Sequence, residues 1–284
     1  MNIAIIANRD KDFGLEVSKR VRDEFIRRGA NAFICREEKS GGFHFTNPEA
    51  VSSADMIVTV GGDGTLIEAA RDLIDLNIPF HGINMGMLGF LTETDIQGIG
   101  ETVRLICEGH YSICERMTAR ADIYRGARII ASDFALNDAV ISKAGHSHII
   151  RFEVSVNGSF LTELHADGMI IATPTGSTAY NLSAGGPIVA PGASMFVMTP
   201  ICAHSLTARS VVFPDDNVIS ITVKNKTGTA YEKSSACEAV FDGADNVLLL
   251  PGDRVDIRRN DRPIRLVKIR DTGFIEVLRR KMGS

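Results

Sequence analysis

The sequence predicts an α/β domain with a parallel sheet, followed by a second domain built mostly of β-strands. Over about the first 115 residues, short apolar runs alternate with stretches of helical periodicity, which is typical of a parallel sheet covered by helices. Beyond that point, alternating apolar and polar residues separated by turn residues indicate antiparallel strands. We therefore expect an α/β domain at residues 1–115 and a β-rich, sandwich-like domain at residues 116–269. Whether residues 270–284 return to the first domain is left open by the sequence.

Composition and charge exclude several classes of protein. The chain has 284 residues, of which 44% are hydrophobic and 23% charged, as in an ordinary globular protein. Its net charge of −4 lacks the Lys/Arg excess of a nucleic-acid-binding protein, and its apolar runs are too short to span a membrane. Five cysteines without a CxxC pair favour reduced thiols, and no basic region precedes the first apolar run. We expect a cytoplasmic protein that binds neither nucleic acid nor membranes.

The elements of the first domain follow from the spacing of its apolar residues. Ile3–Ala7 predicts a strand, and Met56–Val60, apolar on both sides of the pleat except at Thr59, predicts a central strand of a parallel sheet. A helix is predicted between them, ending at the C-cap residue Gly29, with a stripe made of Phe13, Val17, Val21 and Phe25. The other predicted elements are strands at 32–35 and 79–83, helices at 66–74 and 99–107, and a loop at 36–50.

In the second part, Asn157-Gly158 between two alternating runs predicts a β-hairpin. Further strands are predicted at 168–172, 218–223, 239–241, 247–250, 255–257 and 264–269.

The first candidate site is the segment GGDGT, which directly follows the central strand and opens a helix. Ligands of open α/β sheets bind beyond the carboxyl ends of strands, and glycines let the backbone approach a phosphate. Asp63 would repel a phosphate, so its carboxylate suggests a hydroxyl to be deprotonated or a metal carried by the phosphates. A capping box at Thr65-x-x-Glu68 accounts for the start of the helix but not for three glycines. The candidate residues are Gly61, Gly62, Asp63, Gly64 and Thr65.

A second candidate is the hydroxyl-rich segment at 167–187, which has no charged side chain after Asp167. Such a surface suits the hydrogen-bonding groups of a nucleotide, although a plain Gly/Ser/Thr-rich surface loop is an equal alternative on these residues alone. Asn137-Asp138 is a weaker signal: two polar residues in an apolar run need partners, or they form an Asx turn. The segment from Gly82 to Phe90 is either another binding loop or a turn. His146 and His148 are two residues apart without a third ligand, so no metal site is expected.

With these motifs together, the chain resembles the NAD kinase family, the ATP- or polyphosphate-dependent kinases that make NADP. The resemblance covers most of the chain. It includes GGDGT at 61–65, NMGMLGFL at 84–91, Asn137-Asp138, and above all DGMIIATPTGSTAYNLSAGGPIV at 167–189. GGDGT is shared with diacylglycerol and sphingosine kinases, whereas the long TPTGSTAY segment is much more specific.

The resemblance implies a role for each of these residues. Asp63 would be the base that accepts the proton of the adenosine ribose 2′-hydroxyl of NAD, next to phosphates held by the glycines and Thr65. Asp167 would lie at the nicotinamide end, and His165 stands where some relatives carry arginine, which affects the choice between NAD and NADH. The other residues implied in nucleotide binding are Asn84, Phe90, Asn137, Asp138, Thr178, Ala179, Tyr180 and Ser183. Mg²⁺ would arrive with ATP, and the family assembles as homo-oligomers in which a neighbouring subunit helps to complete the site.

Two alternatives remain. A lipid kinase of the diacylglycerol or sphingosine type would share GGDGT but not the hydroxyl-rich segment, and it should show a lipid-facing surface. A non-catalytic NAD(H)-sensing module would bind NAD without needing Asp63.

Overall fold

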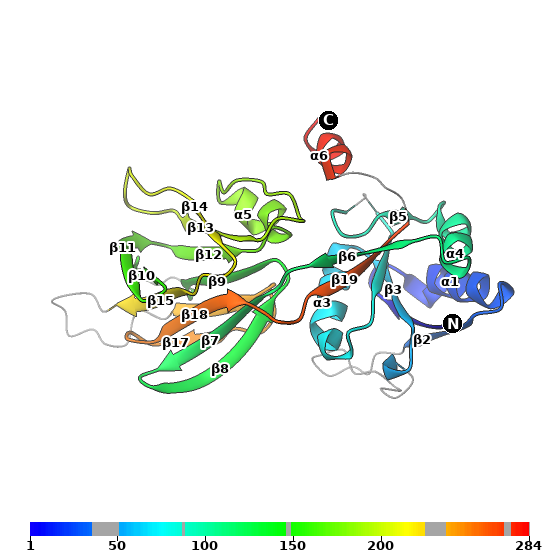
Figure 1. Ribbon diagram of the computed structural model, residues 1–284, viewed down its shortest axis with the longest axis horizontal. Helices are drawn as coiled ribbons and strands as arrows, with labels where there is room; N and C mark the ends of the chain where they lie inside the picture. Colours follow the sequence, from blue (N-terminus) through cyan, green and yellow to red (C-terminus); the bar gives the residue numbers. More distant parts are fainter. Residues whose placement is uncertain (36–50, 87–88, 146–148, 225–236, 270–273, 284) are drawn as a thin grey trace. The chain divides into compact units, whose positions relative to one another are not determined.

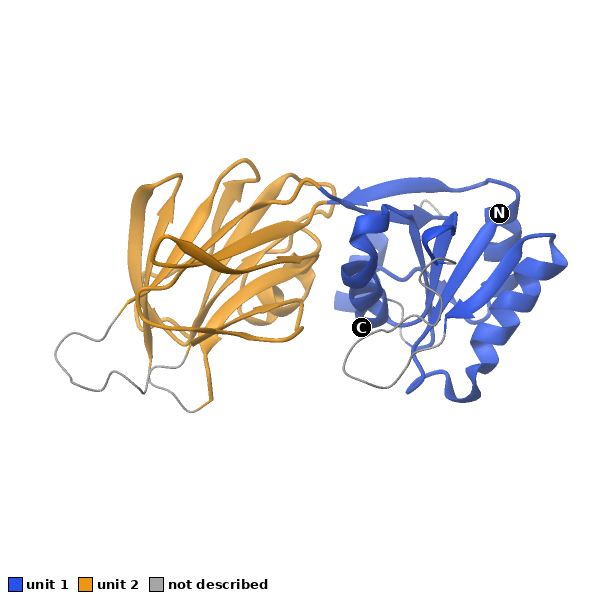
Figure 2. Cartoon of the chain, turned by 90° about the horizontal axis from the view of Figure 1, so that it is seen from below, with its two compact units in different colours: residues 1–116, 262–284 blue, residues 117–261 orange. Residues whose placement is uncertain are grey.

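The computed structural model describes residues 1–35, 51–86, 89–145, 149–224, 237–269 and 274–283 (Figure 1). The chain forms two compact units, one of residues 1–116 and 262–284 and one of residues 117–261 (Figure 2). The predicted loop at 36–50 and the pair His146 and His148 lie outside the described residues. Within the described ranges, no helix is long and apolar enough to cross a membrane.

Unit 1 is built on a sheet with the strand order β2-β1-β3-β4-β19-β6, with β5 beside β4. All neighbouring strands in it are parallel except β19 and β6. Its strands are β1 (Asn2–Ala7), β2 (Asn31–Cys35), β3 (Met56–Gly61), β4 (Phe80–Asn84), β5 (Thr94–Asp95), β6 (Ser112–Arg116) and β19 (Ile264–Lys268). The helical segments are η1 (Phe13–Leu15), α1 (Glu16–Arg27), α3 (Asp63–Leu73), η2 (Ile74–Leu76), α4 (Ile99–Cys107) and α6 (Phe274–Met282).

Helices cover both faces of this sheet (Figure 1). Apolar residues of α1 and α4, among them Phe25 and Val103, share a core cluster with Ile83 of β4. The adjacent Gly82 lies under Leu66 of α3. Because successive residues of a strand point to opposite faces, α3 covers the face opposite to α1 and α4. The prediction of an α/β domain with a parallel sheet is confirmed.

The start of α1 differs from the sequence-based expectation. Phe13 is 90% exposed and is not part of the buried stripe. Gly14 and Leu15 have positive φ and break the helical path, so α1 begins only at Glu16. The buried Asp12 carboxylate accepts hydrogen bonds from the amides of Val17 and Ser18, at 3.0 and 2.8 Å. A side-chain acceptor for the free amides of the first turn therefore determines where this helix starts.

The C-terminal part returns to unit 1 at residue 262, eight residues before the segment that the sequence left open. The alternating segment at 264–269 was predicted to belong to the second domain. It forms β19, which is part of the unit 1 sheet. It pairs with β4 in parallel and with β6 in antiparallel orientation. Alternation identifies a strand but does not identify its partner, which explains the misplacement.

Unit 2 consists of two antiparallel sheets, with the strand orders β11-β10-β15-β18-β7-β8 and β14-β13-β12-β9-β16-β17. Strands of the first are β7 (Ala119–Arg125), β8 (Arg128–Ala135), β10 (Ile150–Val156), β11 (Ser159–Ala166), β15 (Ile219–Lys224) and β18 (Arg254–Arg259). Those of the second are β9 (Asp138–Lys143), β12 (Gly168–Ala172), β13 (Met195–Ile201), β14 (Val211–Pro214), β16 (Cys237–Phe241) and β17 (Val247–Leu249). Both sheets contribute to one buried cluster, for example Phe152 of β10 and Phe241 of β16. The predicted β-sandwich-like unit is confirmed.

The hairpin between β10 and β11 forms as predicted. Asn157 and Gly158 both have positive φ, as the favoured two-residue turn requires. The hydroxyl-rich segment contains η3 (Gly176–Thr178) and α5 (Tyr180–Ser183). Its continuation covers the second sheet, because Val189 packs against Ile170 and Val197 in a separate small cluster.

Candidate active site

GGDGT lies at the position in the unit 1 sheet where open α/β folds bind ligands. The strand order β2-β1-β3-β4 reverses direction between β1 and β3, which makes their carboxyl ends the topological switch point. The chain after β1 is held there, because the Asn8 amide donates to Val60 and its side chain donates to Thr65 Oγ1, at 2.9 and 3.1 Å. Lys11 reaches the same place: its Nζ lies 3.0 Å from where a Cβ on Gly62 would be.

The glycines of this motif have different structural roles. A Cβ on Gly61 would overlap the Thr65 hydroxyl, so packing alone requires a glycine there. A Cβ on Gly64 would meet no described atom within 4 Å. Packing against the described residues therefore does not explain Gly64, whereas close approach of a ligand would.

The prediction that Thr65 is the N-cap of a capping box is wrong. The helix begins at Asp63 with Gly62 as its N-cap, so Thr65 is the third helical residue rather than the cap. Its hydroxyl accepts instead from the Gly62 amide, at 3.4 Å, and from Asn8.

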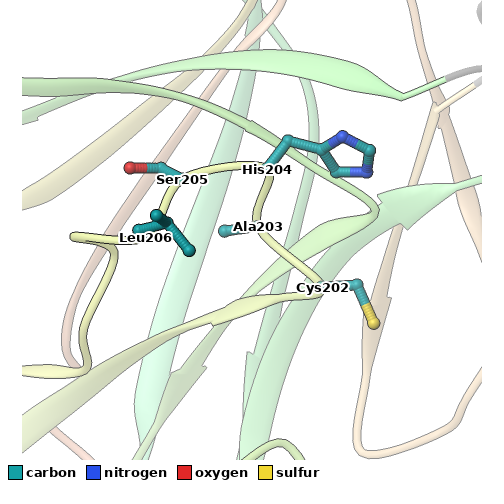
Figure 3. A pocket seen from close by; sticks show the side chains of 5 residues that line it. All are labelled: Cys202, Ala203, His204, Ser205 and Leu206. Atoms are coloured by element: carbon teal, nitrogen blue, oxygen red, sulfur yellow. The ribbon is translucent and has the colours of Figure 1, made fainter.

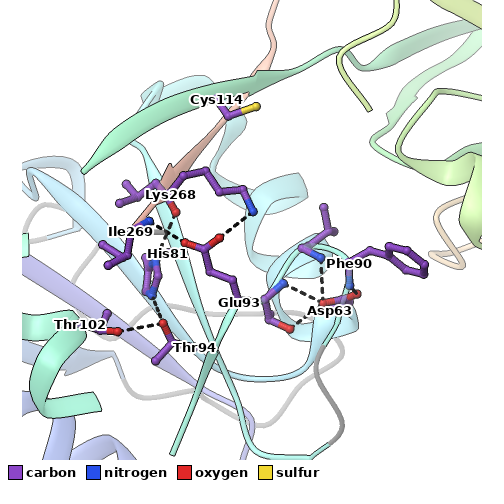
Figure 4. Close-up of polar contacts among 12 residues, drawn as sticks. Asp63, His81, Phe90, Glu93, Thr94, Thr102, Cys114, Lys268 and Ile269 are labelled. Atoms are coloured by element: carbon purple, nitrogen blue, oxygen red, sulfur yellow. Dashed lines mark hydrogen bonds and ion pairs between the residues drawn. The ribbon is translucent and has the colours of Figure 1, made fainter. Parts of the chain in front are cut away.

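Asp63 is surrounded by backbone and hydroxyl donors from one loop (Figure 4). Its Oδ2 accepts from the Phe90 amide at 2.7 Å. Its Oδ1 accepts from the Leu91 amide at 3.3 Å and from both the amide and the hydroxyl of Thr92, at 3.0 and 2.7 Å. A Cβ on Gly89 would overlap the Asp63 carboxylate, so only glycine allows this approach. The loop thus determines the orientation of the carboxylate.

The hydrogen-bond chain to Asp63 has a fixed direction. Asn84 Nδ2 donates to Thr92 Oγ1 at 2.7 Å. An amide nitrogen can only donate, so the Thr92 hydroxyl uses its own proton toward Asp63. The sequence pointed to Asn84 and Phe90 as binding residues; the structure places Asn84 behind Thr92 and the Phe90 amide on Asp63. Met87 and Leu88 of the same motif lie outside the described residues.

The loop is anchored to the sheet on its other side (Figure 4). Glu93 pairs with Lys268 at 3.0 Å and accepts from the Ile269 amide at 2.6 Å. Thr94 Oγ1 bonds the buried His81 ring at 2.9 Å. Burial lowers the pKa of His81, so this ring serves as a neutral hydrogen-bonding group.

The end of the chain lies against Phe90. The rings of Phe274, the first residue of α6, and Phe90 have centroids 6.4 Å apart. Lys281 Nζ lies 4.7 Å above the Phe90 ring, within cation–π range.

In unit 2, Asn137 and Asp138 lie where β8 passes into β9, and Asp138 is the first residue of β9. Thr173, just after β12, bonds this segment twice: its amide donates to Asn137 O at 2.8 Å and its hydroxyl to Leu136 O at 2.5 Å. A Cβ on Gly176 would overlap the Asn137 backbone. The structure therefore brings Asn137-Asp138 and the hydroxyl-rich segment together.

Asp138 has an unusual ionisation. Burial, with a contribution from the negative charge of Asp242, raises its pKa from 3.8 to about 7. The side chain is buried, although it is part of a segment expected to bind a ligand. A carboxyl group with a strongly raised pKa is typical of functional sites.

The structure separates the residues of the second candidate site into two groups. Thr173, Ser177 and Asn181 are fully buried and hydrogen-bonded inside the unit; for example, Ser177 Oγ donates to Pro174 O at 2.6 Å. The predicted binding residues are more accessible. Tyr180 and Ser183 are exposed, and Thr178 and Ala179 are half-buried.

His165 and Asp167 do not join this group. Asp167 precedes β12, pairs with Lys143 at 2.8 Å and lies at the end of the strand opposite to Thr173. Six residues of extended chain span roughly 20 Å. His165 accepts through its carbonyl from the His204 amide at 2.7 Å, and Cys202–Leu206 line a surface pocket in this region (Figure 3). The predicted site residues of unit 2 therefore form two separate groups.

Three residues with evident roles in these contacts were missed from the sequence. Lys11 could have been found because it follows the first strand, where switch-point ligands bind. Thr92 lies just beyond the recognised NMGMLGFL motif. No sequence pattern pointed to Asp242, because its hydrogen-bond partners lie more than 100 residues away in the sequence.

Comparison with known proteins identifies the family. A model of the ATP-NAD kinase N-terminal domain matches residues 36–111, and one of the ATP-NAD kinase C-terminal domain matches residues 136–269. The chain belongs to the NAD kinase family. It is 40% identical to an NAD kinase of Lachnospira eligens over 98% of both chains. It is 35% identical to an NAD kinase of Lachnoclostridium phytofermentans, over 99% of this chain and 98% of the relative.

Solved structures of the NAD kinase family share the fold. A yeast NADH kinase in complex with NADH superimposes with a TM-score of 0.82 at 23% identity, covering all of this chain and 87% of the other. An NAD kinase from Archaeoglobus fulgidus in complex with ATP gives a TM-score of 0.76 at 23% identity, covering 99% and 98%. The family and the fold class predicted from the motifs are both confirmed.

Proposed function

We propose that this chain is an NAD kinase, which transfers the terminal phosphoryl group of ATP to the 2′-hydroxyl of the adenosine ribose of NAD. The observation that carries the proposal is the Asp63 carboxylate, held at the switch point by the loop from Gly89 to Thr92. Among the described contacts, Oδ1 accepts three hydrogen bonds and Oδ2 accepts one. The three contacts of Oδ1, of which the one from the Leu91 amide is long at 3.3 Å, use its acceptor capacity, whereas Oδ2 has room for a substrate hydroxyl beside its one described contact.

The chemistry of the reaction explains the need for such a group. A ribose hydroxyl is barely acidic at neutral pH, so the rate depends on positioning and on proton acceptance in the transition state. We assign the proton acceptance to Asp63. The free amides at the start of α3, the open backbone at Gly64 and the Lys11 ammonium supply positive charge for the phosphates of ATP.

Magnesium enters this proposal as part of the Mg·ATP substrate, since phosphate oxygens are the hard ligands that the ion prefers. The described donors around Asp63 are backbone N–H groups, which cannot ligate a cation, and the Thr92 hydroxyl, which directs its proton to Asp63. Mg²⁺ bound to the triphosphate would neutralise its charge. Polyphosphate remains an alternative phosphoryl donor.

The NAD side of the proposal rests on unit 2. Asn137 and Asp138 extend from a firmly bonded segment, beside the accessible residues of the hydroxyl-rich segment. These residues, Thr178, Ala179, Tyr180 and Ser183, offer hydroxyl, amide and aromatic groups for adenine and ribose. Because unit 2 matches the ATP-NAD kinase C-terminal domain, the lipid-kinase alternative loses its support.

We also propose a cytoplasmic homo-oligomer. Two pairs of predicted site residues are separated along β12: His165 and Asp167 at one end, Asn137 and Asp138 at the other. This separation supports a site that two subunits share, in which His165 and Asp167 contact NAD held by a neighbouring subunit. Reduced cysteines support the cytoplasm: all five cysteines are free, and burial raises the pKa of the Cys35 and Cys237 thiols to about 12.

The test is NADP formation from NAD, ATP and Mg²⁺, coupled to an NADP-specific dehydrogenase. Asp63→Asn should fold and bind NAD but lose turnover by about two orders of magnitude or more, the usual contribution of a general base. Asp12→Asn is the matched control, because Asp12 is also a carboxylate bonded to backbone amides in unit 1. It should lower thermal stability and keep turnover.

The outcomes separate the hypotheses. Full activity of Asp63→Asn would disprove the base assignment. If the parent chain binds NAD but forms no NADP with either ATP or polyphosphate, the kinase proposal fails and an NAD(H)-sensing module replaces it.

A further inference from the structure

Asp242, just beyond β16, bonds the segment that carries Asn137 and Asp138. Its Oδ2 accepts from the Leu136 amide at 2.6 Å. Its Oδ1 accepts from the amides of Asn137 and Asp138, at 2.7 and 3.1 Å. In return, the Asp242 amide donates to Asp138 O at 3.1 Å. One side chain thus bonds three consecutive amides, from the connection between β8 and β9 to the first residue of β9.

The backbone at Asp242 is arranged for this contact. Asp242 has φ of 52°, a left-handed conformation that is unfavourable for residues other than glycine and is tolerated best by Asn and Asp. Gly243 follows with φ of 75°. An unfavourable backbone conformation that is held by several hydrogen bonds is a reason to look for function.

The same segment is held from its other side by β12. Because β9 lies between β12 and β16, Thr173 and Asp242 act on it from opposite neighbours. Thr173 bonds the carbonyls of Leu136 and Asn137, while Asp242 bonds the amides. All of these bonds use backbone groups of residues 136–138. They orient the segment without occupying the side chains of Asn137 and Asp138.

We infer that Asp242 is a positioning residue for NAD: it holds the Asn137-Asp138 segment in the arrangement that binds the dinucleotide. The inference rests on the proposed function of this site. Asp242 also influences Asp138 through its charge. Burial is the larger cause of the raised Asp138 pKa, and Asp242 is the charged group in the described part of the chain that adds to it. Removing that charge therefore lowers the pKa of Asp138.

The experiment compares Asp242→Asn with the parent chain in KM for NAD, kcat, and the pH dependence of kcat/KM between pH 5.5 and 8.5. An asparagine keeps the size of the side chain but places an NH₂ group against an amide donor. We expect KM for NAD to rise about tenfold or more, with kcat changing less. In the pH profile of kcat/KM, we expect the midpoint that reports the Asp138 carboxyl, whose pKa is about 7 in the parent chain, to move to lower pH. A merely structural effect would not cause this shift.

The matched control is Asp253→Asn. Asp253 is another buried carboxylate of unit 2; it accepts from the Leu250 amide at 2.8 Å and pairs with Arg125 at 2.7 Å. Asp253→Asn should lower the melting temperature. KM for NAD and the midpoint of the pH profile should both stay the same as in the parent chain. If the control shows the same changes as Asp242→Asn, the positioning role is wrong.

Two further measurements keep the inference testable if Asp242→Asn does not fold. Asp242→Glu keeps the charge but displaces the oxygens, so it should raise KM for NAD and keep the pH midpoint. In the parent chain, the amides of residues 136–138 should exchange slowly with deuterium. Fast exchange of these amides, or an unchanged KM in both variants, overturns the inference. Absence of NADP formation by the parent chain would instead disprove the proposed function, and NAD binding would then replace KM as the measurement.

Discussion

At Asp63 the number of donors matters less than their direction. The Thr92 hydroxyl receives a hydrogen bond from Asn84 and gives its own proton to Asp63. This one-way chain keeps Oδ1 occupied, whereas Oδ2 accepts one hydrogen bond among the contacts of the described residues. In the role of base that we propose for it, Asp63 needs no rearrangement before it meets the substrate hydroxyl, which is the advantage of a preorganised site.

The Thr92 hydroxyl can be removed with little change of shape. Thr92→Val should lower kcat about tenfold and leave KM for ATP nearly unchanged, because it removes a hydrogen bond to a charged group worth roughly 1.5–3 kcal/mol. Thr92→Ser, which restores the hydroxyl, should recover most of kcat. Steady-state kinetics of both variants provide the measurement.

Thr102→Val is the matched control for this experiment. Thr102 is a buried threonine of the same unit, bonded to Thr94 at 3.0 Å, and it does not contact Asp63. It should lower stability without lowering kcat. Equal losses of kcat in Thr92→Val and Thr102→Val would show that the effect is only structural.

At the scale of elements, η3 and the segment between β8 and β9 depend on each other. Gly176, the first residue of η3, lies directly on the Asn137 backbone. Any side chain at this position would push the two segments apart, since backbone atoms cannot move aside as a flexible side chain would.

Gly176→Ala should therefore weaken NAD binding at least tenfold and lower the stability of unit 2 by about 1–3 kcal/mol, the usual cost of overpacking. Gly192→Ala is the matched control. A Cβ there meets no described atom within 4 Å, so NAD affinity should not change. Calorimetric NAD titration and thermal melts of both variants test the pair. Normal NAD affinity in Gly176→Ala would contradict the role of this contact.

At the scale of the whole molecule, the two groups of predicted site residues in unit 2 support the proposal that another subunit completes the site. Asp167 and Asp138 lie at opposite ends of paired strands, since Ser142 pairs with Gly168 and Asp138 with Ala172. This pairing prevents the two carboxylates from approaching within one subunit unless the sheet is broken.

Co-expression of two inactive variants tests the shared site. Asp63→Asn and Asp167→Asn should each lose activity alone, and mixed oligomers should regain measurable NADP formation, because some sites receive both intact residues. Light scattering of the parent chain should show an oligomer. A monomer, or mixed oligomers without any recovered activity, would contradict this proposal.

The sequence by itself determined what depends on neighbours along the chain. Apolar spacing determined the strands at Ile3–Ala7 and Met56–Val60, Asn157-Gly158 determined a hairpin, and the order of GGDGT and TPTGSTAY determined the family. These signals are local, because a helix, a strand or a tight turn is specified within a few residues.

Only the tertiary structure decided which distant segments meet. Alternation at 264–269 indicated a strand, but only the sheet showed that it belongs to unit 1. Composition indicated a polar segment at 167–187, but only packing separated the buried Ser177 from the exposed Tyr180. The bonds of Asp242 to residues 136–138 had no signal in the sequence, because strand order and register bring them together across more than 100 residues.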